Sequence, residues 1–243
     1  MKTIPTILLA VCAAVILAPA ASAQEAQDKT VKVRFRVFGW DDSPSDLNYS
    51  YRGKDAGLVI LQDNRSVFYD YTGPAAIRFY RLKTGGDGKP IREIAARADL
   101  SKAGPWPLIL LARNQAKPDQ YEARVLRDDL ISFPSGTYAF SNFSTTPITG
   151  SLGGQIFTLS PGEDKVLKGN ARENGTTLFA ALVKMEDSRK VPIYTNNWAI
   201  QPMKRTRVFI KASPESPSGL VSIRVVESTV FPPENDDTVS KAD

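Results

Sequence analysis

The feature that most constrains the fold is a sequence pattern that occurs twice in the chain. The stretches 89–114 and 190–213 both begin with lysine, contain a Pro-Ile pair and end in an apolar run. Apolar runs and turn residues recur in one order at an offset of about 100 residues, which is the size of an immunoglobulin-like β-sandwich with about seven strands. Solenoid and propeller repeats are much shorter. The sequence therefore predicts two tandem immunoglobulin-like β-sandwich modules.

Short apolar runs that alternate with polar residues predict strands rather than helices. In VKVRFRVF (31–38) valine and phenylalanine alternate with cations, and WPLILLAR (106–113) is nearly all apolar, as in a strand covered on both faces. The best candidate for a helix is the short stretch 91–100. The predicted class is all-β.

Matching the two halves gives the predicted boundaries. Phe38 is matched with Phe140, the turn YRGK (51–54) with LGGQ (152–155), and PLILL (107–111) with RVFIK (207–211). The acids and the Pro-Ser-Gly turn of 128–137 interrupt the pattern. We therefore expect the modules to cover residues 24–130 and 131–230.

The two ends of the chain differ from the body. Residues 1–23 combine an early cation, an apolar run and an Ala-Ser-Ala site, which predicts a cleaved signal peptide and a periplasmic or secreted protein. A lipoprotein signal using Cys12 is the alternative. No later stretch is long and apolar enough to cross a bilayer as a helix, so no transmembrane segment is expected in the mature chain. The acidic tail 231–243 is predicted to be disordered.

Composition excludes several chemistries. The chain has no histidine, and Cys12 is its single cysteine. Serine and cysteine nucleophiles activated by histidine, and zinc sites built on histidine, are thereby excluded. We expect no cofactor, no metal and no enzyme activity, with a pair of carboxylates as the remaining catalytic option. The net charge of +5 is mild, and no nucleic-acid-binding motif is present, so no nucleic acid is expected as a partner.

One acidic and aromatic stretch, WDDSPSDLNYSY (40–51), is a candidate ligand site. It can form a turn with its tryptophan in the core, a platform on which sugar rings stack, or a calcium loop. The calcium pattern lacks its central glycine and is interrupted by Pro44. The candidate residues are Trp40, Asp41, Asp42, Asp46, Tyr49 and Tyr51.

Two basic clusters are candidates for docking an envelope protein or an anionic polysaccharide. A solvated outer sheet face explains them equally well. Trp106 and Trp198, which fall in the same region of each repeat, are expected to anchor the two cores. The clusters consist of Lys32, Arg34 and Arg36, and of Lys204, Arg205 and Arg207.

A mid-chain phrase carries a family resemblance. It comprises Phe-Pro-x-Gly-x-Tyr-like, Phe-x-Asn, Leu-Gly-Gly and Leu-x-Pro-Gly elements at 133–138, 140–142, 152–154 and 159–162. This phrase resembles secreted two-sandwich proteins of unassigned function from verrucomicrobial-type bacteria. The resemblance implies a paired β-sandwich in an envelope protein, and it implies no activity or binding residue.

These observations together favour an exported, non-catalytic binding or structural protein of the cell envelope whose ligand is unknown. One alternative is a carbohydrate-binding or carboxylate-dependent carbohydrate-active protein. The other is a periplasmic chaperone-like strand donor, which rests on analogy of fold alone.

Overall fold

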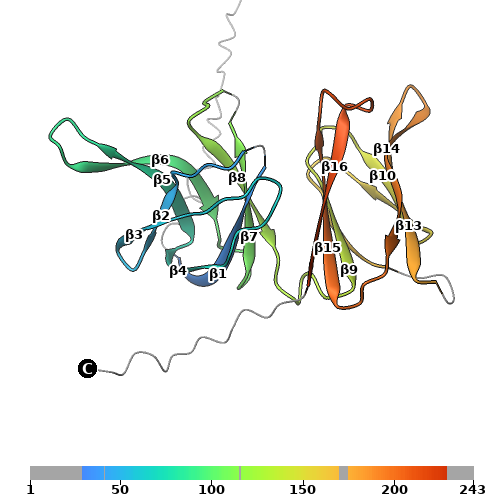
Figure 1. Ribbon diagram of the computed structural model, residues 1–243, viewed down its shortest axis with the longest axis horizontal. Helices are drawn as coiled ribbons and strands as arrows, with labels where there is room; N and C mark the ends of the chain where they lie inside the picture. Colours follow the sequence, from blue (N-terminus) through green and yellow to red (C-terminus); the bar gives the residue numbers. More distant parts are fainter. Residues whose placement is uncertain (1–28, 41, 115, 170–174, 229–243) are drawn as a thin grey trace, which may run out of the picture.

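Every regular element of the described residues is a strand. The computed structural model describes residues 29–40, 42–114, 116–169 and 175–228, and these form sixteen strands without a helix (Figure 1). The all-β class is confirmed. The predicted signal peptide and the predicted disordered tail lie outside the described residues. No helix in the described part could cross a membrane.

The first module contains eight strands in two four-stranded sheets, ordered β4-β1-β7-β8 and β3-β2-β5-β6. Its strands are β1 (Thr30–Gly39), β2 (Asn48–Tyr51), β3 (Lys54–Gly57), β4 (Tyr69–Pro74), β5 (Ala76–Thr84), β6 (Pro90–Asp99), β7 (Pro107–Arg113) and β8 (Tyr121–Arg127).

The second module repeats this order, since β12-β9-β15-β16 and β11-β10-β13-β14 are the same sheets with eight added to each number. Even the parallel pair recurs, as β1 with β7 and β9 with β15. The internal repeat is thus a repeat of topology, with eight strands a module rather than about seven. Its strands are β9 (Thr137–Asn142), β10 (Ile148–Leu152), β11 (Gln155–Leu159), β12 (Asp164–Lys168), β13 (Thr177–Glu186), β14 (Arg189–Ala199), β15 (Lys204–Ala212) and β16 (Leu220–Ser228).

The expected short helix at 91–100 is wrong, because this stretch forms most of β6. It pairs with β5 from Ala76↔Asp99 to Thr84↔Pro90. Ala95, Ala96 and Ala98 are buried in the core of the first module. Alanine has the highest intrinsic helix propensity, but propensity is a weak determinant of structure, and long-range pairing that buries these residues overrides it.

The match of Phe38 with Phe140 is wrong by one residue. Phe140 lies in the core of its own module, whereas Phe38 packs against the other module. The counterpart of Phe140 is Val37, which lies in the core of the first module. Since successive side chains of a strand point to opposite faces, this slip of one residue exchanges core and outer face.

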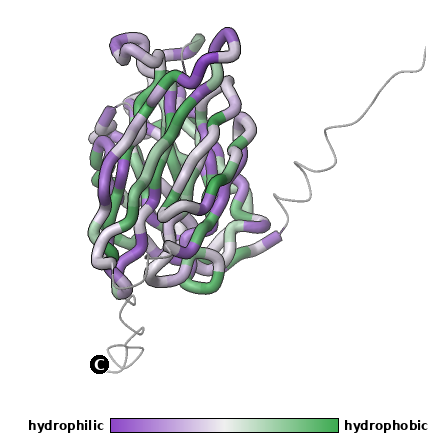
Figure 2. The backbone as a smooth tube through the Cα atoms, turned by 90° about the vertical axis from the view of Figure 1, so that its right-hand side faces the viewer, coloured by the Kyte–Doolittle hydropathy of each residue, from purple (hydrophilic) through white to green (hydrophobic). Residues whose placement is uncertain are grey.

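A third apolar cluster joins the modules, because the sheets β4-β1-β7-β8 and β12-β9-β15-β16 face one another (Figure 1). The ring centroids of Phe38 and Phe209 are 5.0 Å apart, and those of Trp40 and Phe143 are 4.5 Å apart. Figure 2 looks onto the second module, whose strands run side by side with hydrophobic and hydrophilic residues interspersed. Two sandwich cores and one shared interface therefore hold the chain together.

Buried charges surround this interface, and we call Arg65, Asp128, Phe133, Arg205, Arg207 and Glu227 the junction cluster. Asp128 follows β8 and accepts hydrogen bonds from Arg65 at 3.2 Å and Arg207 at 2.9 Å. Glu227 of β16 pairs with Arg65 and Arg205, each at 2.6 Å. Buried charges of opposite sign stabilise one another only when such partners are in place.

Candidate functional site

The two described acidic side chains of the loop 40–51, Asp42 and Asp46, do not converge on one point. Arg113 binds Asp42, with its Nε 3.0 Å from Oδ2, whereas Arg81 binds Asp46 at 2.6 Å. Asp41 lies outside the described residues. The described part of the chain contains no group of three histidine, cysteine or acidic side chains that could hold a metal ion.

Two of the three aromatic residues of this loop are unavailable to a ligand. Trp40 is 8% exposed and lies between the modules, and Tyr49 is 3% exposed in the core of the first module. A sugar platform made of these rings is therefore wrong. Tyr51 is only half-buried, because β2 ends there and leaves its ring at the rim of the sandwich.

Half of the predicted basic docking residues are not available for docking. Arg205 and Arg207 are 5% and 3% exposed, since they belong to the junction cluster. Arg36 pairs with Glu227 of the other module at 2.6 Å. Alternation along a strand shows which residues leave the core, but it cannot show that a second sheet covers them. Lys204 is half-buried at the start of β15.

The structure does bring together Lys32, Arg34 and Tyr51 from the two predicted groups. They line a hollow of about 400 Å³, which we call the cationic pocket. Strand β1 supplies both cations on its outer face, and the β2–β3 turn supplies Tyr51 and Arg52. Its lining includes Lys32, Arg34, Tyr51, Arg52, Asp70 and Trp106.

The charge of the cationic pocket is unbalanced. Among the described residues that line it, three cations face one carboxylate, Asp70, whose Oδ1 lies 2.9 Å from Nε of Arg34. Within the described ranges no carboxylate forms a salt bridge with Lys32 or Arg52. Arg52 lies over the ring of Tyr51, with 5.1 Å from its guanidinium carbon to the ring centroid. A hollow of this kind attracts anions.

A tight turn presents Arg52. Arg52 and Gly53 have φ of 50° and 77°, and a two-residue turn with both φ positive joins antiparallel strands closely. A left-handed backbone is unfavourable for residues other than glycine. The turn YRGK therefore holds its arginine at some cost in backbone energy, which is a reason to suspect a role for that side chain.

The neighbouring strands fix the floor of the cationic pocket. The hydroxyl of Tyr49 donates a hydrogen bond of 3.1 Å to the backbone oxygen of Asp70 and so ties β2 to β4. Burial, with a further contribution from the Asp70 carboxylate, raises the pKa of Tyr49 to about 12. This hydroxyl therefore stays protonated and keeps donating across the whole physiological range.

At the matched positions the second module has none of these cations, although it shares the topology. When Val37 is matched with Phe140, Arg34 corresponds to Thr137. The turn that holds Arg52 corresponds to the turn at Gly153. The topology that the two modules share therefore does not require a cation at these positions.

Sequence reasoning missed Arg52, Asp70 and Trp106. It assigned Trp106 to a core, whereas its ring is half-buried at the cationic pocket. Trp198 does lie in the core of the second module, as expected. The sequence did contain a signal for Arg52. The first module has Arg-Gly at a hairpin turn where the second has Gly-Gly, and arginine adopts the positive φ of such a turn less readily than glycine.

No family model and no curated protein matches the chain. One solved structure that it matches is that of a "putative cell adhesion protein" from Bacteroides eggerthii DSM 20697. The two share 9% sequence identity with a TM-score of 0.24, over 81% of this chain and 96% of that chain. A likeness of this size carries no argument about function.

Proposed function

We propose that the chain is an exported, non-catalytic binding protein of the cell envelope, and that its first module binds an anionic polysaccharide in the cationic pocket. The observation that carries the proposal is that Lys32 and Arg52, which form no salt bridge with any described residue, line one hollow with the half-buried Tyr51 and Trp106. Export rests on the sequence of residues 1–23.

The chemistry of the pocket suits a sugar acid. A carboxylate on the sugar can accept hydrogen bonds from Lys32 and Arg52, which are stronger than those between neutral groups. The C–H face of a sugar ring can pack on Trp106 or Tyr51, where a small inorganic anion would leave the aromatic surface unused. The volume of about 400 Å³ lies within the usual range for small-ligand sites.

Binding is favoured over hydrolysis because the conspicuous acids are neutralised. Retaining and inverting glycosidases need two carboxyl groups that face one bond. Here Asp42 and Asp46 are each held by a different arginine, and Asp70 is the one carboxylate among the described residues that line the pocket. Release of reducing sugar from polygalacturonate would contradict the non-catalytic part of the proposal.

Affinity electrophoresis tests the proposal directly. Gels that contain polygalacturonate should retard the protein, and gels that contain neutral dextran should not. Lys32→Glu and Arg52→Glu should abolish the retardation, whereas Lys168→Glu makes the same charge change on an exposed strand of the other module and should retain it. Equal retardation of all three variants would mean that net charge alone causes the retardation, and it would contradict binding in the cationic pocket.

A further inference from the structure

The two modules differ where β2 meets β5. In the second module β10 pairs with β13 at five positions, from Ile148↔Lys184 to Leu152↔Ala180. In the first module β2 pairs with β5 at one position, Asn48↔Tyr80. The two modules share a topology, but these two strands are paired along their length in the second module and at one position in the first.

The two bulges identify the pair that is missing. The register shifts between Phe79 and Tyr80 in β5, and between Leu182 and Val183 in β13. Counting back two residues from each bulge matches Arg78 with Ala181. In the second module Ala181 pairs with Ser151, whereas Arg78 has no such partner on β2.

The backbone of β5 faces the opening. Leu100 donates to the oxygen of Ala75 at 2.8 Å, so odd-numbered residues of this stretch bond to β6. The N–H and C=O groups of Ala76 and Arg78 then point toward β2. Within the ranges that the structure describes, the register of β2 and β5 contains the pair Asn48↔Tyr80 and no pair at Ala76 or Arg78. Unpaired strand groups are ready to accept another strand.

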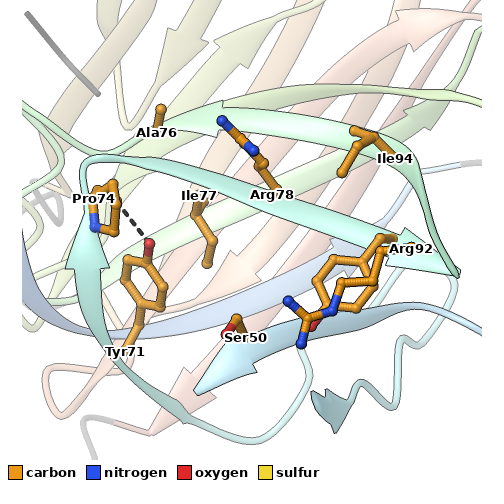
Figure 3. A pocket seen from close by; sticks show the side chains of 9 residues that line it. Ser50, Tyr71, Pro74, Ala76, Ile77, Arg78, Arg92 and Ile94 are labelled. Atoms are coloured by element: carbon orange, nitrogen blue, oxygen red, sulfur yellow. Dashed lines mark hydrogen bonds between the residues drawn. The ribbon is translucent and has the colours of Figure 1, made fainter. Parts of the chain in front are cut away.

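A hollow of about 470 Å³ occupies the opening, and we call it the β2–β5 gap. Figure 3 labels residues that line it from three strands, Ser50 of β2, Ile77 of β5 and Ile94 of β6. Tyr71 reaches the gap from the facing sheet, held by a hydrogen bond of 2.7 Å to the oxygen of Pro74. The gap therefore offers apolar side chains beside unpaired backbone.

The charges at the gap select an acidic occupant. Arg92 already has partners within the module. Its Nη2 lies 2.6 Å from Oδ1 of Asp55, and its guanidinium carbon lies 4.9 Å from the ring centroid of Tyr80. Arg78 is exposed, and the described part of the chain holds no salt-bridge partner for it. A carboxylate in the gap would meet this cation.

We propose that the β2–β5 gap takes one extended strand of a partner protein, paired with the backbone of Ala76 and Arg78 and carrying an acidic side chain against the Arg78 guanidinium. This is strand addition to a sheet edge. The main-chain hydrogen bonds supply affinity. The contacts that the partner's side chains make with Ile77 and Arg78 supply selectivity. The proposal is independent of the cationic pocket, since it uses neither Lys32 nor Arg52.

The probe is the peptide acetyl-Thr-Val-Glu-Val-Thr-amide, whose binding to the full chain is followed by fluorescence anisotropy and by amide hydrogen exchange. Binding should slow exchange of the Ala76 and Arg78 amides or of the peptide's own amides. Replacing the central glutamate with proline removes an N–H and should abolish binding. The lysine version of the peptide should bind about tenfold more weakly, since a charge-assisted bond becomes a repulsion.

Two variants separate the site from general electrostatics. Arg78→Glu should lower the affinity for the glutamate peptide about tenfold and raise the affinity for the lysine peptide. Arg189→Glu makes the same change on an exposed position of β14 in the second module and should leave both affinities within about twofold. Absence of binding, equal binding of the proline peptide, or indifference to Arg78→Glu would each overturn the proposal.

Discussion

Nη2 of Arg207 donates a hydrogen bond of 2.9 Å to Oδ1 of Asp128, and this pair joins the segment after β8 to β15 of the second module. Both side chains are almost fully buried, and Arg65 of the first module binds the same carboxylate. The ring of Phe133 lies against the guanidinium of Arg207, with 4.6 Å between the ring centroid and the guanidinium carbon. The modules are therefore locked by buried charge as well as by apolar packing.

Asp128→Asn should lower the free energy of unfolding by about 3–5 kcal/mol, because it keeps the shape of the side chain while leaving buried arginines without their counter-charge. Chemical denaturation measures this loss. Asp164→Asn, which breaks a more exposed pair with Arg124 at 3.3 Å, should cost less than about 1 kcal/mol. Equal losses in the two variants would contradict a special role for the junction.

The same carboxylate should make stability depend on acid. Burial opposes the charged form of Asp128, but Arg65, Arg207 and Arg205 outweigh burial and hold its pKa below the ordinary value of 3.8. As pH falls through 3.8 the unfolded state takes up the proton first, so Asp128 stabilises the fold above that pH and its contribution is lost below it. The stability difference between wild type and Asp128→Asn should stay constant from neutral pH to about 5 and shrink below 3.8. A constant difference down to strong acid would be inconsistent with the proposed pairing.

Phe209→Ala should destabilise the chain by about 3–5 kcal/mol, because it opens a cavity between the modules. Calorimetry of the wild type should show both modules unfolding in one transition, and the variant should separate them into two. Phe179→Ala removes a ring that is 50% exposed on β13 and should leave one transition. Two transitions in the wild type would mean that the interface does not couple the modules.

Arg52→Gly should separate stability from binding. Glycine adopts the positive φ of this turn freely, so the free energy of unfolding should stay equal or rise by up to about 1 kcal/mol. Retardation by polygalacturonate should nevertheless disappear, because the guanidinium is gone. A variant that loses stability would indicate that Arg52 serves the fold rather than a ligand.

Local alternation and the internal repeat were enough to predict the class and the two modules. They correctly placed Phe35 inward and Lys32 outward on β1. They could not show that Arg205 and Arg207 would be covered, because an outer face becomes an interface only through a partner far away in sequence. Nor could they fix the match of the halves to one residue, since both faces of β1 and β7 are apolar at the interface.

The candidate site was only partly predictable for the same reason. Lys32, Arg34 and Tyr51 were named on separate grounds, and only the folded chain brings them to one hollow. The β2–β5 gap left no local signal, because it is a missing pairing between strands of ordinary composition.

The tryptophan indole N–H signals test the central claim most directly, since Trp40 and Trp198 are 8% and 3% exposed and Trp106 borders the cationic pocket. Titration of the ¹⁵N-labelled chain with oligogalacturonate should shift the Trp106 signal in a saturable way and leave the other two in place. Parallel shifts of all three signals, or a Trp106 signal that does not move at saturating ligand, would contradict binding in this pocket.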